Sequence, residues 1–542
     1  MVGAGAWSHR WAALLALATV GCGGATPPSA APDAPGRRWL VATPVDLAGV
    51  NELVSGGVRF SQEILRLLFL GLLEEQPDYA AHPPSFRPAL AESWELSPAR
   101  DALTVRLRAD ARWSDGRPIT ARDVLFSHRA QTSPEVAWSY ADSKDAISEL
   151  TALDERTLVF RFREVYPYQV VDANDGLILP AHAWEEIPFS AWRGSGERFR
   201  ERLVTSGPYS LAEWIPGVEL TLAPNPHFPA PLGRADRAVT FRVVPDAAAL
   251  VERLAAGAFD FADGLSPYDA VRVARSPRLR LLTTDARQID FVGWNASREP
   301  FDDPEVRRAL TLGIDRQALV DALWQGRARV AAGPVPANVW ARDPELVPWP
   351  YDPAAARTLL AARGFADRDR DGIVERHGKP FRFELSTNSE NRVRADACVL
   401  IQEQLRRIGV EVEIRTLEIH ALVARNEARE FDATLAGWSI DTTLDFRPYF
   451  HSSARAEGWN WVGYAEPEVD RALEEARRQG DAEATRPHLV RLQRLLHRDQ
   501  PYTFLWEPQR ISAARVELAG VETTPLSAFG TLPHWRRTAP AR

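Results

Sequence analysis

The stretch from Asp396 to Ile414 most constrains the fold, because it joins an amphipathic helix directly to a strand. Apolar residues recur there at the spacing of one helix face: Ala397, Leu400, Ile401, Leu405 and Ile408. Gly409 follows at the position where helices usually end, and residues 410–414 then alternate as in a strand. A helix that leads straight into a strand is half of a βαβ unit. The chain is therefore predicted to be an α/β protein whose helices cover a sheet.

Mixed helix and strand patterns continue along the chain. Strands are predicted at 103–107, 158–162 and 431–437, and helices are predicted to begin near Thr120, Asp303, Asp315 and Pro467. The length of 542 residues exceeds what one core usually holds, so more than one domain is expected.

Charge and motif content exclude several functions. The net charge is −8, and nucleic acid is therefore not an expected partner, because phosphate binding needs a basic face. The sequence has no GxSxG, HExxH, phosphate-loop or dinucleotide-binding motif, and its two cysteines form no metal-ligand pattern. These absences predict a protein that is not an enzyme and has neither a cofactor nor a structural metal.

The amino terminus has the pattern of an export signal. His9 and Arg10 precede an apolar run at residues 11–20, which is too short to span a bilayer. Cys22 then follows small residues, and this end of the run resembles a bacterial lipobox, although Thr19 departs from it. We predict a signal peptide at 1–21, lipidation of Cys22 and a flexible tether at 22–36. A plain secretory signal is the alternative.

An Asp-rich segment has partial calcium-loop spacing. Asp367, Asp369, Asp371 and Gly372 match it, but Gly378 occupies the twelfth position, where such a loop needs a glutamate. A surface hairpin turn is favoured, and calcium binding is left open.

The segment "FDATLAGWSID" (431–441) reads as a buried strand with polar residues at its end. Asp441 follows Trp438 directly beyond the apolar run. Its carboxylate has three possible roles: an acid or base, a charge that meets a ligand, or a cap for the next segment.

Several blocks resemble the bacterial extracellular solute-binding proteins of family 5, the peptide- and nickel-binding proteins of ABC importers. The blocks include "LAESWELSPARDALTVRLRADARWSDGRPITARDV", "FVGWNASREPFDDPEVRRALTLGIDRQALV" and "FDATLAGW". The resemblance covers nearly everything after the tether. It implies a two-lobed periplasmic-binding-protein-like type II fold with an extra subdomain inserted in lobe one. The implied boundaries are 37–70, 181–285 and 509–542 for lobe one, 71–180 for the inserted subdomain, and 286–508 for lobe two.

The same resemblance implies a ligand site between the lobes. Asp441 falls where peptide-binding members hold the α-amino group of the ligand, although another alignment places Asp445 there. Gly437, Trp438, Ser439, Asn295 and Trp506 are the other expected ligand-binding residues.

The implied function is a lipid-anchored, monomeric, periplasmic protein that passes di- or oligopeptides to a permease of the inner membrane. The alternatives are the same fold with another solute, such as a nickel complex or an oligosaccharide, and a sensor or hydrolase built on this shell.

Overall fold

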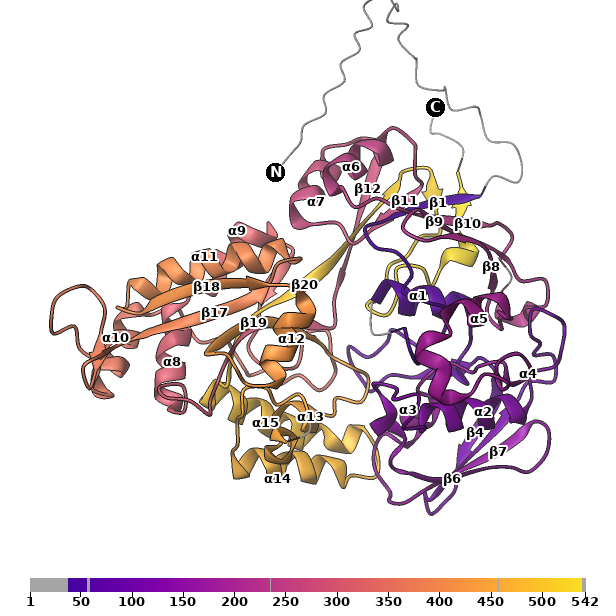
Figure 1. Cartoon of the computed structure of the whole chain (residues 1–542), viewed down its shortest axis with the longest axis horizontal. Coiled ribbons are helices and arrows are strands. Elements are labelled where there is room, and N and C mark those ends of the chain that lie inside the picture. The colour runs from indigo at the N-terminus through magenta and orange to yellow at the C-terminus, as the bar shows by residue number, and fades with distance from the viewer. Residues whose placement is uncertain (1–37, 56–58, 234, 457, 539–542) are drawn as a thin grey trace, which may run out of the picture. The chain divides into compact units, whose positions relative to one another are not determined.

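A 12-stranded sheet runs through the computed structural model, which describes residues 38–55, 59–233, 235–456 and 458–538 (Figure 1). Ten of its strands form the path β18-β17-β19-β13-β20-β11-β1-β10-β9-β8, and β12 and β14 also pair with β20. The strands are β1 (Trp39–Thr43), β8 (Tyr209–Ile215), β9 (Glu219–Pro224), β10 (Val239–Val243), β11 (Phe261–Asp263), β12 (Leu279–Asp285), β13 (Gln288–Trp294), β14 (Ala328–Val330), β17 (Arg382–Asn388), β18 (Glu411–Leu417), β19 (Ala433–Ser439) and β20 (Tyr502–Arg515).

The predicted helix–strand unit is confirmed. Helix α11 (Arg392–Arg406) connects β17 to β18, and these two strands pair in parallel, which completes the βαβ unit. Gly409 has a φ of +81°, a conformation that a residue with a Cβ atom adopts only at a cost, so glycine suits the turn between the helix and the strand.

Strand β20 is shared between two groups of strands. Its first residues pair with β13 and β14, and its residues from Gln509 onward pair with β12 and β11. In Figure 1 it runs as a long yellow ribbon through the middle of the view. The chain passes from one group to the other a second time between Asp285 and Gln288, where β12 ends and β13 begins.

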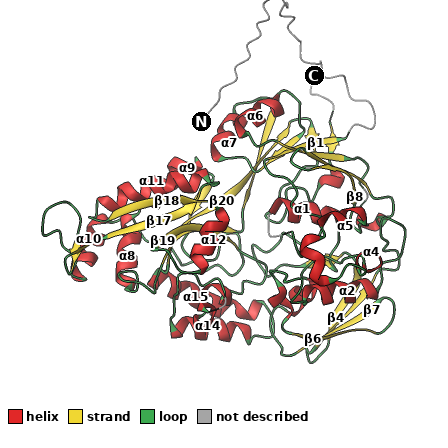
Figure 2. Cartoon of the chain, viewed as in Figure 1, coloured by secondary structure: helices red, strands yellow, loops and turns green. Residues whose placement is uncertain are grey.

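Strands β13 and β19 are buried on both faces. Val292 and Trp294 belong to one apolar cluster, which includes α8, α9 and α11, whereas Ile289 and Phe291 belong to another, which includes α14 and α15. Because side chains alternate along a strand, these two clusters lie on opposite faces of the sheet. Figure 2 shows the helices around these strands.

The remaining elements form smaller sheets and the covering helices. A four-stranded antiparallel sheet has the order β4-β5-β7-β6, and three two-stranded sheets accompany it. These strands are β2 (Leu73–Glu75), β3 (Phe86–Pro88), β4 (Ala91–Leu96), β5 (Ala102–Leu107), β6 (Ile147–Ala152), β7 (Thr157–Phe162), β15 (Glu375–Arg376), β16 (Lys379–Pro380), β21 (Leu518–Ala519) and β22 (Arg536–Arg537). The helices are α1 (Arg59–Leu68), α2 (Ala121–Gln131), α3 (Gln169–Asn174), α4 (Ala181–Trp184), α5 (Gly196–Glu201), α6 (Ala247–Ala255), α7 (Pro267–Ala274), α8 (Pro304–Gly313), α9 (Arg316–Trp324), α10 (Pro353–Ala362), α12 (Ile419–Glu427), α13 (Arg447–Phe450), α14 (Pro467–Arg477) and α15 (Arg486–Asp499).

The predicted signal peptide, Cys22 and the tether lie outside the described residues. Among the residues that the structure describes, no helix combines the length and the apolar character needed to cross a bilayer.

Candidate functional site

Strand β19 places Trp438 and Ser439 at its carboxyl end, and its register depends on a close approach at Gly437. Gly437 lies opposite Asp290 of β13. A Cβ atom at Gly437 would lie 2.1 Å from Oδ1 of Asp290 and 2.4 Å from Nη2 of Arg394. Glycine is therefore required here because an ion pair occupies the space of a side chain.

That ion pair is buried and well coordinated. Arg394 donates from Nη2 to Oδ1 of Asp290 at 2.9 Å and from Nε to Oδ2 at 3.1 Å. The indole Nε1 of Trp506 also donates to Oδ2, at 3.1 Å. Gln288 Nε2 donates to Oδ1 of Asp290 as well, at 2.8 Å. Asp290 is 1% exposed, so these four hydrogen bonds compensate a carboxylate that is almost fully shielded from water.

Aromatic rings surround Trp438. Its ring centroid lies 4.4 Å from that of Trp461 and 4.9 Å from that of Tyr449, and Trp459 stacks on it at 5.9 Å. We call Trp438, Tyr449, Trp459 and Trp461 the Trp438 cluster. The Nε1 atoms of Trp438 and Trp461 are buried without a hydrogen-bond acceptor among the described residues. The cluster thus presents aromatic faces and two spare donors beside the end of β19.

Asp441 begins the loop after β19 and uses one carboxylate oxygen to order it. Its Oδ1 accepts hydrogen bonds from the main-chain N–H groups of Thr443 and Leu444, both at 3.0 Å, and from Oγ1 of Thr443 at 2.7 Å. The capping role is therefore present. The described part of the chain offers no cationic partner for Asp441 within ion-pair distance and no donor to its Oδ2.

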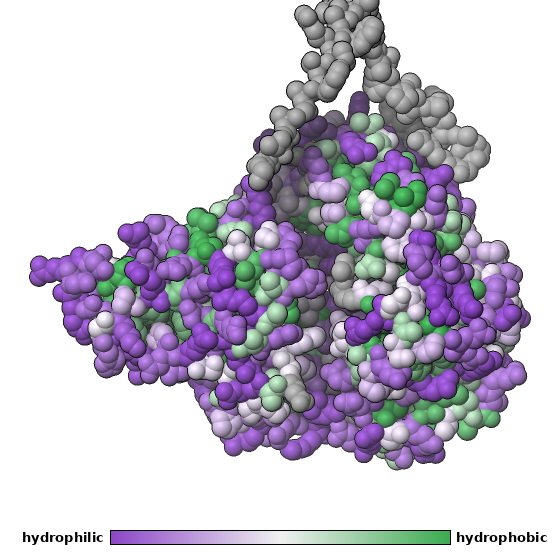
Figure 3. Space-filling view, viewed as in Figure 1, coloured by the Kyte–Doolittle hydropathy of each residue, from purple (hydrophilic) through white to green (hydrophobic). Residues whose placement is uncertain are grey.

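We call the surroundings of Asp441 the recess. Water reaches the side chain, yet protein encloses it closely enough that lost hydration raises the pKa of its carboxyl group. Asp445 adds to this rise, whereas Thr443 and Arg287 oppose it. A ligand cation stabilises a carboxylate that is enclosed in this way more than it stabilises a carboxylate on an open surface. In the view of Figure 3, the surface is hollowed between the elements at the left and those at the right.

Thr442 connects the loop to a distant segment of the chain. Its Oγ1 donates to Oε2 of Glu75 at 2.8 Å, and Nη1 of Arg287 donates to Oγ1 of Thr442 at 3.2 Å and to Oε1 of Glu75 at 3.3 Å. The guanidinium of Arg287 also lies 4.8 Å above the ring of Tyr79. Glu75 belongs to β2 and Tyr79 follows it, so these contacts hold the loop of Asp441 against the segment that precedes the four-stranded sheet.

Asp445, the alternative anchor, already has cationic partners. Arg447 lies 3.1 Å from its Oδ2, and Arg477 lies 3.9 Å from the same oxygen. Two guanidinium groups balance Asp445, whereas none in the described part of the chain pairs with Asp441. Asp441 is therefore the better candidate for an added cation.

The segment 164–168 approaches Asp445 through Arg477. Arg477 of α14 forms an ion pair with Glu164 at 2.7 Å and lies 5.2 Å above the ring of Tyr166. Tyr168 is 5% exposed. Burial is the largest cause of the raised pKa of its hydroxyl, and the carboxylates of Asp445 and Asp441 raise it further. This segment was not predicted from the sequence, because nothing in its local pattern connects it to a loop so far along the chain.

The other predicted ligand-binding residues have different positions. Ser439 is exposed at the end of β19, as expected for a residue beside the recess. Asn295 is fully buried instead, and its amide donates to the main-chain oxygens of Phe431 and Arg429 at 2.7 and 3.2 Å. Trp506 is also fully buried, with its Nε1 bound to Asp290. Both therefore support the fold in this structure and do not line the recess.

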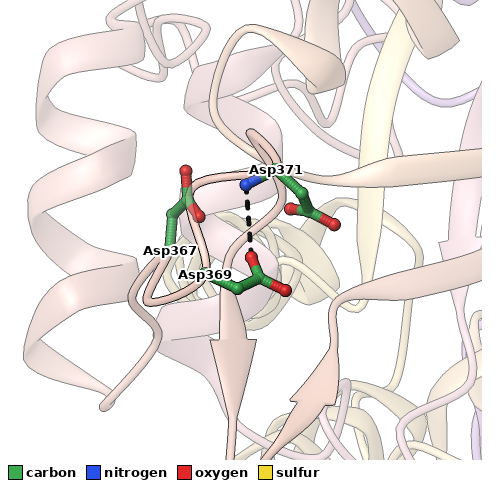
Figure 4. Close-up of side chains that lie close together, drawn as sticks. All are labelled: Asp367, Asp369 and Asp371. Atoms are coloured by element: carbon green, nitrogen blue, oxygen red, sulfur yellow. Dashed lines mark hydrogen bonds between the residues drawn. The ribbon is translucent and has the colours of Figure 1, made fainter.

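The Asp-rich loop forms a surface turn before the β15–β16 hairpin (Figure 4). One oxygen from each of Asp367, Asp369 and Asp371 lies within 4.8 Å of the others, and all three residues are exposed. The three carboxylates accept hydrogen bonds from main-chain N–H groups of the same turn. These bonds account for the aspartates as turn formers.

Comparisons with known proteins agree with the fold. Residues 85–461 match the family model of the bacterial extracellular solute-binding proteins, family 5. The oligopeptide-binding protein AppA of Bacillus subtilis is 30% identical over 452 residues, which cover 82% of this chain and 83% of that protein. The di/tripeptide-binding protein 2 of Pseudomonas aeruginosa is 28% identical and covers 81% of this chain and 85% of its own length.

Comparison with solved structures finds the same fold. The structure of AppA from Bacillus subtilis in complex with a nonapeptide has a TM-score of 0.80 and 28% identity, and it covers 93% of this chain and 99% of its own. NikZ from Campylobacter jejuni in complex with Ni(L-His) has a TM-score of 0.79 at 23% identity and covers 92% of this chain and 99% of its own. The fold is thus that of the two-lobed periplasmic binding proteins. The chain belongs to family 5 of the bacterial extracellular solute-binding proteins.

Proposed function

We propose that this chain binds peptides in the recess beyond β19 and delivers them to an ABC importer. The observation that carries the proposal is Asp441, a water-accessible carboxylate that has no cationic partner among the described residues and lies three residues beyond Trp438. The names of the relatives support the ligand class, because AppA binds oligopeptides and the protein of Pseudomonas aeruginosa binds di- and tripeptides. These relatives are solute-binding proteins, and we propose that this chain, too, has no catalytic activity.

The residues of the recess suit the amino end of a peptide. The ammonium group would approach Oδ2 of Asp441, while Oδ1 stays bound to the loop. The aromatic faces of Trp438 and Tyr449 would contact the first side chain without selecting one sequence. Enclosure of the ligand between the two groups of strands would remove water from this pair and strengthen it.

Ligands that remain bound through purification test the proposal. The protein is purified under mild conditions, denatured, and the released molecules are identified by mass spectrometry. Peptides at a stoichiometry near one per chain are expected. Release of oligosaccharides or nickel complexes in place of peptides would contradict the proposal and favour another solute.

We also propose that the two groups of strands are the lobes and that residues 71–180 are a subdomain inserted in lobe one. In this scheme the lobes meet at β20 and at the crossing near Arg287. Closure on a ligand would follow bending at these two connections. The chain would act as a monomer, with a membrane permease as its partner.

Lipidation of Cys22 is a separate prediction, because this residue lies outside the described structure. The Cys22→Ala variant should lose processing that globomycin inhibits and should move from the detergent phase to the aqueous phase. The physical reason is that several acyl chains anchor a protein stably. A protein whose signal is removed without lipidation carries no acyl chain. Normal membrane retention of the variant would exclude the lipobox.

A further inference from the structure

We propose that Arg477 is a positioning residue that couples enclosure of a ligand to the loop of Asp441. Resting on the peptide-binding function proposed above, the inference concerns how long a bound peptide is held and not which peptide binds. Arg477 is the last residue of α14, and its guanidinium lies between two carboxylates from distant parts of the chain, those of Asp445 and Glu164.

The contacts of Arg477 join two segments that are far apart in the sequence. Its Nε donates to Oε1 of Glu164 at 2.9 Å, and its Nη2 lies 2.7 Å from the same oxygen. The guanidinium also lies 5.2 Å from the centre of the Tyr166 ring. On the other side, Nη1 lies 3.9 Å from Oδ2 of Asp445, in the loop that Asp441 begins. One side chain therefore connects the segment after β7 to the loop that holds the proposed ligand anchor.

These two segments belong to different apolar clusters. Tyr166 packs in the cluster that also includes β5 and β7. Val469 and Leu473 of α14 pack instead in the cluster of Phe291 and Tyr502. The contact between the segments is therefore a polar one, an ion pair with a ring face, at a place where the two clusters remain separate. Such a contact can open without exposing an apolar core to water.

The contact of Glu75 with the same loop differs in kind. Tyr79, which follows Glu75, is buried and packs in the same cluster as α14. Moving this segment away from the loop would expose apolar surface, which is costly. Moving Glu164 away from Arg477 would break an ion pair that water already reaches. Opening and closing therefore act at the Arg477 contact and not at Glu75.

The exposure of the pair fits a reversible contact. The side chain of Glu164 is 51% exposed and that of Arg477 is 23% exposed. An ion pair that water still reaches stabilises a contact modestly, and salt weakens it. A modest contribution suits this place, because a binding protein has to release its ligand as well as hold it. Loss of the pair should speed the release of ligand and leave the folded state intact.

Release of alanine peptides from the full chain tests the inference. Di- to hexa-alanine are bound in deuterated form, an excess of the unlabelled peptide is added, and the bound label is followed over time by mass spectrometry. The Glu164→Gln variant should release the label about three- to tenfold faster than the native protein does. Arg477→Met should have a similar effect. Arg477→Lys, which keeps the charge but not the fork of donors, should restore part of the slow release.

Two controls replace ion pairs that lie within one part of the fold. Glu149→Gln breaks a pair of exposed side chains with Arg161 in the four-stranded sheet. Arg478→Met, directly after α14, breaks a pair with Glu474 of that helix. Both should release the label at the native rate. The midpoint of denaturant unfolding should be the same in all these variants, and a lower midpoint that accompanies faster release would show a merely structural role and contradict the inference.

The remaining outcomes separate this inference from the function on which it rests. Release at the native rate from both Glu164→Gln and Arg477→Met would overturn the role of the pair and leave peptide binding intact. Faster release from Arg477→Met alone would show that Arg477 acts through Asp445 without enclosing the ligand, and would also overturn the inference. Failure of every alanine peptide to bind the native protein would overturn the proposed function, and this inference with it.

Discussion

The Asp441→Asn variant should bind a peptide with a free amino terminus about thirty- to several-thousand-fold more weakly than the native protein does. Loss of a desolvated charge partner typically costs about 2–5 kcal/mol. Asparagine keeps the shape of the side chain and can still accept the hydrogen bonds of Thr443 and Leu444, so the loop should remain ordered. Calorimetry with a peptide and its N-acetylated form measures the effect.

The acetylated peptide is the control because it has no ammonium to lose. The variant should weaken its binding far less, so the two proteins and two ligands form a double-mutant cycle. Equal losses for both ligands would show that Asp441 acts only as a cap for its loop. Asp445 would then be the next residue to replace, although Arg447 and Arg477 already compensate its charge.

The Arg394→Met variant should lose about 3–5 kcal/mol of unfolding free energy. Arg394 is 12% exposed and makes two contacts to Asp290, which has almost no contact with water. Methionine removes the charge but fills much of the same volume. Asp290 would keep the hydrogen bonds of Trp506 and Gln288 but would have no cation, and a buried carboxylate without one is strongly unfavourable. Denaturant unfolding measures the loss.

Arg415→Met is the matched control. Arg415 is 51% exposed and pairs with Glu384 at 3.1 Å on the neighbouring strand, so its loss should cost less than about 1 kcal/mol. Comparable losses in the two variants would contradict the argument that burial makes the Asp290 pair important. Because Asp290 and Arg394 occupy the space beside Gly437, the Arg394 variant should also disturb the end of β19, where Trp438 and Ser439 lie.

Local sequence patterns were enough to predict the helix and the strands near the site. The helix face at 397–408, Gly409 and the alternation that follows correspond to α11 and β18, because each pattern depends on neighbours within a few residues. The predicted strand at 431–437 corresponds to β19 within two residues at each end. The position of Asp441 directly after this strand also followed from the sequence.

The neighbours of Asp441 could not be predicted in this way. Periodicity places a residue on a face of its own element, but it carries no information on which remote segment meets that face. Asn295 and Trp506 were expected at the ligand because of the family resemblance. Only the tertiary structure revealed that Asn295 is bound to Phe431 and Trp506 to Asp290 in the interior.

The sequence by itself determined the α/β class, the strand that ends at Ser439 and the family resemblance, because these depend on local order along the chain. The tertiary structure decided that Glu75 and Arg287 meet Thr442 in the loop of Asp441, and that Arg477 approaches Asp445. These contacts join residues on different elements, and they exist only after the strands have paired and the two groups of elements have packed. Charge balance in the recess is therefore a property of the folded chain, since an acid is unpaired only when the positions of all its neighbours are known.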